Sequence, residues 1–183
     1  MPGSEIAAII RRCTSADTGT IASLGARLFV QAYGATHPEP ELSRYLARTY
    51  SPEVIGSAIE DEGSVVFVAE DSVSAPVGYA HIAATEEFPD GVQGRSAFEI
   101  VRFYVDAERQ RRGVGAALMR ACCDAAIQGG GDVVWLQVWT QAPWAIGFYQ
   151  RMDFSIVGKK PFYFGARTDH DHVMSRTLQP KPS

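Results

Sequence analysis

Cysteine is scarce in this chain of 183 residues, which carries only Cys13, Cys122 and Cys123. An odd and sparse set does not form a disulfide framework. Neighbours such as Cys122 and Cys123 point in different directions on a helix, so they cannot hold a metal without other ligands. We interpret all three as small apolar core residues in a reducing compartment, which predicts a cytoplasmic location.

The chain also lacks a basic excess, with 17 Lys and Arg against 21 Asp and Glu and a formal net charge of −4. Binding to nucleic acid phosphates needs such an excess, so nucleic acid is not an expected partner. We expect no signal peptide, because no basic segment followed by a long apolar run begins the chain. No apolar stretch is long enough to cross a bilayer, so a membrane is not an expected partner either.

The overall composition is that of a globular protein, with 46% hydrophobic and 21% charged residues. The length suits one domain with its own core. The sequence shows no internal repeat and no linker between domains. We therefore predict that residues 1–183 form a single domain.

Apolar periodicity predicts a mixed α/β sheet with flanking helices. The predicted strands are residues 6–12, 65–70, 77–83, 98–105, 133–139, 154–157 and 172–178. The predicted helices begin after a cap at Asp17, near Leu42, at Pro52 after a cap at Ser51, at Gly113 and at Pro143. A polar loop with an Asp90-Gly91 turn signal fills residues 86–95.

The most informative stretch is Gln110-Arg111-Arg112-Gly113-Val114-Gly115, between a predicted strand and a predicted helix. A helix N-terminus leaves backbone N–H groups unpaired and carries a partial positive charge. Glycine lets the backbone come close to a phosphate, and the two arginines add positive charge nearby. The stretch therefore indicates an anion site suited to a pyrophosphate.

Two other phosphate motifs fit this stretch poorly. No Gly-Lys-Ser/Thr follows, as a Walker loop would require. Leu118 stands where a dinucleotide fingerprint has its third glycine. A glycine-rich helix start without any ligand remains the structural alternative.

The stretch resembles the acyl-CoA-binding motif of the GNAT superfamily, Gln/Arg-x-x-Gly-x-Gly/Ala. Residues 135–139 and 145–154 are similar to that family's fifth strand and following helix, and residues 162–165 and 173–178 resemble its PaiA-like polyamine acetyltransferases. The resemblance implies a single-domain α/β GNAT fold with a mixed central sheet. It further implies an N-acetyltransferase that moves an acetyl group from acetyl-CoA to a primary amine, such as a polyamine, without a metal.

The resemblance also implies a set of cofactor-binding residues. Pantetheine would pair with the backbone of the fourth strand, and the pyrophosphate would meet backbone N–H groups at the start of the following helix. The residues are Phe103, Tyr104, Val105, Gln110, Arg111, Arg112, Gly113, Val114, Gly115 and Ala116. Core packing of Phe103 and Val105 is compatible with this role, because the implied contact is through the backbone.

Tyr149 matches the tyrosine that relatives place beside the CoA sulfur. A phenol there can protonate the departing thiolate, which makes it a better leaving group. Helix patterning alone favours a buried aromatic residue at this position. The match of Phe148-Tyr149, followed by Met152 and Phe154, favours the proton donor.

Glu99 is the candidate general base. An ammonium cannot attack a carbonyl carbon, so the acceptor nitrogen must first lose a proton, and a carboxylate can take it directly or through water. The alternative is a structural ion pair with Arg102 or another basic side chain. Some relatives carry an acid where this chain has Val101.

Two further positions depart from the family pattern. Ala142 stands where an asparagine often contacts the cofactor, and Asp153 replaces the usual glycine after the helix. Aspartate tolerates left-handed backbone angles, so we expect the turn at Asp153 to survive.

Other readings stay open at this point. The acceptor could be a peptide N-terminus or an amine antibiotic, or the chain could be an acyl-CoA-binding regulator without catalysis. Glu86, Glu87 and Asp90 form either a solvated turn or a rim that attracts cations. We interpret residues 169–172, Asp-His-Asp-His, as a surface strand, since a metal site needs three or four convergent ligands. A homodimer is plausible from the superfamily only.

Overall fold

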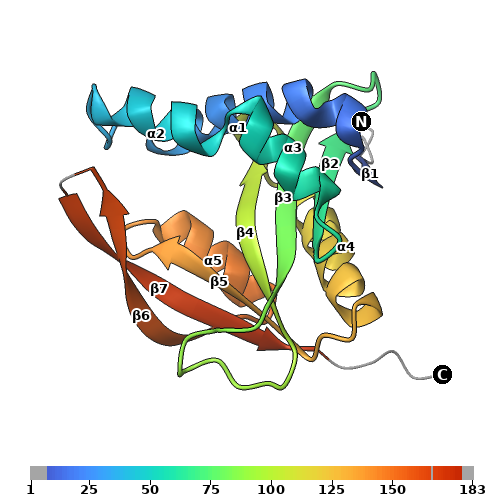
Figure 1. Ribbon diagram of the computed structural model, residues 1–183, viewed down its shortest axis with the longest axis vertical. Helices are drawn as coiled ribbons and strands as arrows, with labels where there is room; N and C mark the ends of the chain where they lie inside the picture. Colours follow the sequence, from blue (N-terminus) through green and yellow to red (C-terminus); the bar gives the residue numbers. More distant parts are fainter. Residues whose placement is uncertain (1–7, 166, 179–183) are drawn as a thin grey trace, which may run out of the picture. The chain divides into compact units, whose positions relative to one another are not determined.

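The computed structural model describes residues 8–165 and 167–178, whose strands and helices are shown in Figure 1. The strands are β1 Ile9–Arg12, β2 Ser64–Glu70, β3 Pro76–Thr85, β4 Ala97–Val105, β5 Val133–Trp139, β6 Ser155–Phe164 and β7 Arg167–Thr177. The helices are α1 Thr18–Tyr33, α2 Glu41–Thr49, α3 Pro52–Glu60, α4 Val114–Gln128 and α5 Pro143–Arg151, with short 3-10 turns at Ser15–Asp17 and Ala107–Arg109.

The contacts within the chain divide it into two compact units. The first unit comprises Met1–His81 and Arg102–Ala121, and the second comprises Ile82–Val101 and Cys122–Ser183. The strand order is β1-β2-β3-β4 in the first unit and β3-β4-β5-β7-β6 in the second, because β3 and β4 run through both. β4 and β5 are parallel, whereas β5, β7 and β6 pair antiparallel. The predicted mixed sheet is confirmed, with seven strands.

Helix α1 covers the core of the first unit with the face that its periodicity predicts. Ile21, Leu24, Leu28 and Phe29 are all buried. Around Phe29 lies a group of aromatic rings whose centroids are between 4.8 and 6.3 Å from its own: Tyr33, Tyr45, Tyr50, Tyr104 and His37. This aromatic cluster was not predicted, because its members come from elements far apart in the sequence.

Gly25 allows α1 to lie close against this cluster. A Cβ atom at Gly25 would stand 2.7 Å from Tyr50 Cδ1 and 2.9 Å from the Tyr79 hydroxyl. Tyr50 and Tyr79 are 5% and 0% exposed, so neither ring has room to move. The glycine is therefore a packing requirement here.

Asp17 stands at the predicted position before α1, but the prediction that its side chain caps the helix is wrong. The Asp17 carboxylate accepts hydrogen bonds from the backbone N–H of Thr14 at 2.8 Å and from Arg11 at 2.9 Å, and it makes no side-chain bond to α1. The bond from Arg11 lowers the pKa of Asp17 to about 2. The predicted cap at Ser51 is confirmed, since its hydroxyl accepts from the N–H of Val54 at 3.2 Å.

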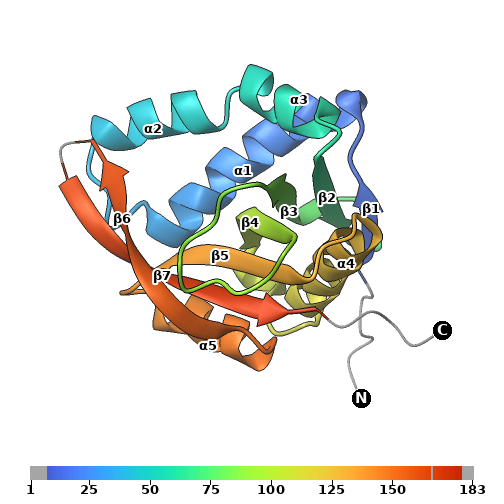
Figure 2. The ribbon, with the colours of Figure 1, turned by 60° about the horizontal axis from the view of Figure 1, so that its bottom comes forward.

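The two last strands are longer than predicted and form an extended hairpin (Figures 1 and 2). Gly158 and Pro161 interrupt the strand pattern in the sequence, so β6 was predicted only as far as residue 157. β6 is the last strand in the order, where a proline without an N–H is tolerated, and a register shift accommodates Gly158. The predicted first strand is confirmed over Ile9–Arg12, and its residues 6 and 7 lie outside the described part of the chain.

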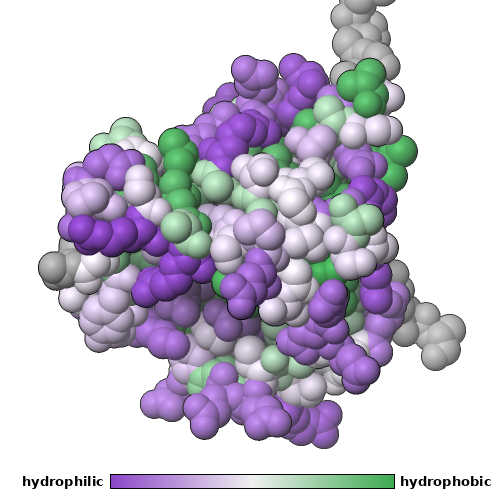
Figure 3. All heavy atoms as spheres, turned by 45° about the horizontal axis from the view of Figure 1, so that its top comes forward, coloured by the Kyte–Doolittle hydropathy of each residue, from purple (hydrophilic) through white to green (hydrophobic). Residues whose placement is uncertain are grey.

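Helix α5 lies beside β5 and β7 in both ribbon views (Figures 1 and 2). Figure 3 shows a face in which hydrophilic residues predominate and apolar residues occur in small groups. Within residues 8–165 and 167–178, no helix combines the length and apolarity needed to cross a membrane.

We predict that Gly25→Ala lowers the free energy of unfolding by about 1–3 kcal/mol, because the new methyl group overpacks a closed aromatic cluster. Gly19→Ala is the matched control in the same helix, since a Cβ atom there would meet nothing within 4 Å. Chemical denaturation of both variants measures the difference. Equal stability of the two variants would contradict the packing argument.

Candidate active site

The loop between β4 and α4 is fixed by ion pairs within the first unit. The Asp106 carboxylate accepts from the backbone N–H of Glu108 at 3.2 Å and from Arg27 at 2.7 Å. Arg109 donates to Asp71, which is 6% exposed, at 3.0 Å. The loop therefore has a defined path before the predicted phosphate-binding residues begin.

The backbone then turns twice through the left-handed region. Arg111 has φ 62° and Gly113 has φ 81°, and the Gln110 side chain donates to the carbonyl oxygen of Val105 at 3.2 Å. A Cβ atom at Gly113 would meet nothing within 4 Å, so glycine serves the backbone angle there and not the packing. The Gln110 side chain thus fastens the loop to the end of β4.

Helix α4 begins with backbone donors that the helix itself cannot use. Its first bond runs from the N–H of Ala117 to the carbonyl of Gly113 at 2.9 Å, so the N–H groups of residues 114–116 have no intrahelical acceptor. Arg111 and Arg112 are exposed beside this helix start. Together these groups form an environment suited to an anion.

The predicted pantetheine-binding residues lie at the end of β4. The register between β4 and β5 pairs residues 97–100 with 133–136, whereas β4 continues to Val105. Phe103, Tyr104 and Val105 are partly buried there. Burial raises the pKa of Tyr104 well above its ordinary value, so its phenol is protonated at neutral pH.

Tyr149 is fixed by the way in which α5 ends. The N–H of Phe154 donates to the carbonyl of Tyr149 and the N–H of Asp153 to that of Gln150, with Asp153 at φ 66°. These two hydrogen bonds form a Schellman motif. The apolar contact that usually accompanies this motif is present, since the ring centroids of Phe154 and Tyr149 are 5.9 Å apart. Tyr149 is 8% exposed, and the left-handed turn expected at Asp153 is present.

Glu99 lies on β4 in the second unit, directly opposite Trp135 in the register. Burial raises the pKa of its carboxyl above the ordinary value, while the Lys160 charge and a hydrogen bond with Gln137 oppose that shift. The Lys160 ammonium lies over the Trp135 ring, 5.9 Å from its centroid. A carboxylate whose pKa is raised is a stronger base than an exposed one.

Arg102, the alternative partner for Glu99, is engaged elsewhere. Its guanidinium donates to Nδ1 of His81 at 3.3 Å and to the carbonyl of Thr49 at 3.2 Å, and it lies 5.6 Å from the Tyr50 ring centroid. Since arginine can only donate, His81 is protonated on Nε2 and donates to Ser64 at 2.7 Å. Burial, with Arg102, lowers the pKa of His81 to about 4 and keeps it neutral.

The register gathers further polar residues on the face of the second unit that carries Glu99. Trp139 lies opposite Asp171 on β7, and Asp171 lies opposite Lys160 on β6. The sequence placed Asp171 on an exposed surface strand, which is wrong, because the residue is 7% exposed. Burial, with the neighbouring Asp169 charge, raises the pKa of Asp171 to about 6.

Sequence reasoning did not single out Gln137, Lys160 or Asp171 as site residues. Gln137 interrupts an otherwise apolar strand, which was the one available signal. Within the described residues no group of three His, Cys, Asp or Glu side chains is placed to hold a metal.

The acidic loop at residues 86–95 rests on this same face through its apolar side chains. Val92 and Phe88 pack in a cluster with Trp135 and Val173. Glu86, Glu87 and Asp90 point outward and are exposed. The loop is therefore anchored, and its carboxylates remain available to solvent.

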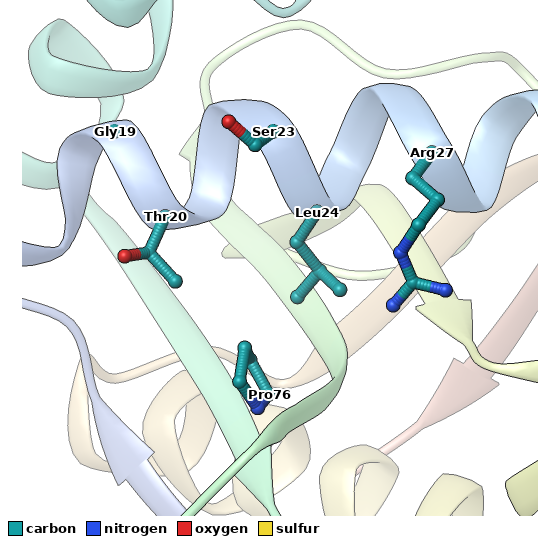
Figure 4. A pocket seen from close by; sticks show the side chains of 6 residues that line it. All are labelled: Gly19, Thr20, Ser23, Leu24, Arg27 and Pro76. Atoms are coloured by element: carbon teal, nitrogen blue, oxygen red, sulfur yellow. The ribbon is translucent and has the colours of Figure 1, made fainter.

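A shallow hollow of about 470 Å³ lies along α1 in the first unit (Figure 4). It is lined by Gly19, Thr20, Ser23, Leu24, Arg27 and Pro76. None of the predicted site residues lines it, and Arg27 is paired with Asp106. We assign no ligand to this hollow.

The chain is similar to known proteins in sequence and in fold. The profile of the Acetyltransferase (GNAT) family matches residues 26–154. An uncharacterized N-acetyltransferase from the pepI 3' region of Lactobacillus delbrueckii subsp. lactis is 23% identical over 151 residues, which cover 82% of this chain and 86% of that protein.

Two solved structures share the fold. PaiA N-acetyltransferase from Thermoplasma acidophilum, in complex with coenzyme A, has a TM-score of 0.70 at 17% identity and covers 94% of this chain and 99% of its own. YncA, a possible acetyltransferase from Salmonella typhimurium with its cofactor acetyl-CoA, has a TM-score of 0.64 at 21% identity, with 96% of each chain covered.

Proposed function

The chain belongs to the Acetyltransferase (GNAT) family, and from this premise we propose that it transfers the acetyl group of acetyl-CoA to a primary amine, with a polyamine as preferred acceptor. The observation that carries the proposal is the start of α4, where backbone donors without intrahelical acceptors follow a glycine at positive φ. Both units would act together as one acetyltransferase domain.

In this proposal the pyrophosphate of acetyl-CoA accepts hydrogen bonds from backbone N–H groups of residues 111–116. Arg111 and Arg112 add charge, and Gln110 holds the loop through Val105. Pantetheine pairs with the backbone of Phe103, Tyr104 and Val105, beyond the point where β4 stops pairing with β5. Ala142, which replaces the family's asparagine, removes one side-chain contact without affecting these backbone donors.

The chemistry needs three proton transfers. Glu99 takes a proton from the acceptor ammonium, directly or through water, and the neutral nitrogen attacks the thioester carbonyl. Backbone N–H groups near Val105 stabilise the oxyanion of the tetrahedral intermediate. The C–S bond then breaks and the thiolate takes a proton from Tyr149. The nitrogen, which carries a positive charge after the attack, gives one proton through water to the Tyr149 phenolate, and the neutral amide forms without a covalent enzyme intermediate.

The preference for a polyamine rests on charge. Glu86, Glu87 and Asp90 are exposed on the loop that packs against Trp135, and Trp135 lies opposite Glu99. A polyamine carries several ammonium groups at neutral pH, and contacts to the groups that do not react help to position the one that does. Each exposed pair contributes only ~0.2–1 kcal/mol, so several must act together.

An acceptor panel tests the proposed function. CoA release is measured with acetyl-CoA and, in turn, spermidine, a monoamine, a peptide N-terminus and an aminoglycoside. We expect the highest kcat/KM for spermidine and a KM for spermidine that rises with salt, because screening weakens charge contacts. A higher kcat/KM for the peptide would show that a protein N-terminus, and not a polyamine, is the preferred acceptor. If no amine causes release of CoA, the chain is an acyl-CoA-binding protein without catalysis.

Tyr149→Phe tests the general acid, because it removes only the hydroxyl. We expect a loss of turnover of about 10²–10⁴-fold with an almost unchanged melting temperature. Tyr163→Phe is the matched control, since Tyr163 is 65% exposed on β6. If Tyr149→Phe keeps wild-type turnover, Tyr149 only packs.

Glu99→Gln tests the general base and its pH dependence. In the wild type, activity falls on the acid side as Glu99 becomes protonated, and this occurs above the ordinary carboxyl pKa because burial raises it. The variant should be slowest relative to wild type near neutral pH and should recover partly at high pH, where more amine is already neutral. A variant with the wild-type pH–rate profile would show that another group takes the proton.

A further inference from the structure

We propose that Asp171 binds a second ammonium group of the acceptor, one that does not react, on the same sheet face as Glu99. The inference rests on the proposed amine acetyltransferase function and extends it to the length and charge of the acceptor. It assigns to β7 a specificity-determining residue that the family motif does not contain.

The first observation is a buried carboxylate oxygen without a donor. Asp171 is 7% exposed, and among the described residues its Oδ1 atom is buried and has no hydrogen-bond partner. Buried carboxylates are normally paired, because removing a charge from water without a partner is costly. A bound cation would supply the missing donor, and the raised pKa of the group agrees with its present lack of one.

The second observation is that the nearest cation in the register is engaged elsewhere. Lys160 lies directly opposite Asp171, but its ammonium is placed over the Trp135 ring and acts on Glu99. On the other side, Trp139 lies opposite Asp171. Indole rings bind ammonium groups through their faces, so carboxylate and indole on adjacent strands suit a cation.

The third observation is the spacing between the two carboxylates. Glu99 pairs with Trp135, Trp135 pairs with Ser175, and Asp171 lies four residues from Ser175 along β7. Two strand spacings and four residues of rise separate the two Cα atoms by roughly 16 Å. Both side chains extend from the same face, so a long triamine can reach from one carboxylate toward the other, whereas a short diamine cannot.

The test compares Asp171→Asn with wild type on spermidine and on butylamine, which has one nitrogen. The measured quantity is the ratio of kcat/KM for spermidine to that for butylamine. We expect Asp171→Asn to lower this ratio about tenfold or more, mainly through KM for spermidine. Glu62→Gln is the control, because it removes one exposed carboxylate in the first unit.

A second measurement uses the wild type alone and so does not depend on the folding of a variant. Carbon-detected NMR follows the carboxyl resonance of Asp171 while spermidine is added in the absence of acetyl-CoA. A saturable shift that butylamine does not produce supports the proposal. A resonance that stays unmoved at saturating spermidine overturns it.

The outcomes separate this inference from the function on which it rests. In one outcome the wild-type enzyme prefers spermidine and Asp171→Asn leaves the ratio of the two kcat/KM values unchanged. This outcome overturns the role of Asp171 but not the acetyltransferase proposal. An equal loss on both amines shows a merely structural residue and overturns the inference too. Wild-type enzyme that acetylates no amine overturns both.

Discussion

The unpaired backbone donors at the start of α4 are the constraint on which the proposed chemistry depends. A helix cannot satisfy its own first N–H groups, and here no side chain of the capping type precedes them, because Arg112 and Gly113 occupy those positions. The surrounding contacts fix where these donors lie: Arg109 binds Asp71, Gln110 binds Val105, and Arg27 binds Asp106. These side-chain contacts fix the path of the loop, and the first N–H groups of α4 have no acceptor within the helix.

In the second unit the charge has the opposite sign. Carboxylates lie there on a partly buried sheet face, whereas positive groups surround the start of α4 in the first unit. Glu99 and Asp171 both have raised pKa values because burial disfavours their charged forms. Lys160 acts on Glu99, and among the described side chains Oδ1 of Asp171 has no hydrogen-bond partner. Two carboxylates on one sheet face suit a positively charged acceptor, and this is the property that the polyamine proposal uses.

Much of this architecture could be predicted from local patterns. The bounds of β5 follow from a run that is apolar except for Gln137, and the starts of α3 and α5 follow from prolines in the first turn. The sequence could not predict the length of β6, because Pro161 is acceptable only at the end of the strand order. Nor could it predict the burial of Asp171 or the pairing of Arg102 with His81, since both depend on contacts between residues far apart in the chain.

The central claim is that acetyl-CoA binds through its pyrophosphate to the backbone at the start of α4. Two-dimensional amide NMR during a titration with acetyl-CoA tests it most directly. The account predicts that the amide protons of residues 111–116 move downfield, as expected on hydrogen bonding to phosphate, and that their shifts saturate at the same acetyl-CoA concentration as the other shifts in the spectrum. Saturable binding of acetyl-CoA that leaves these six amides unmoved would contradict it.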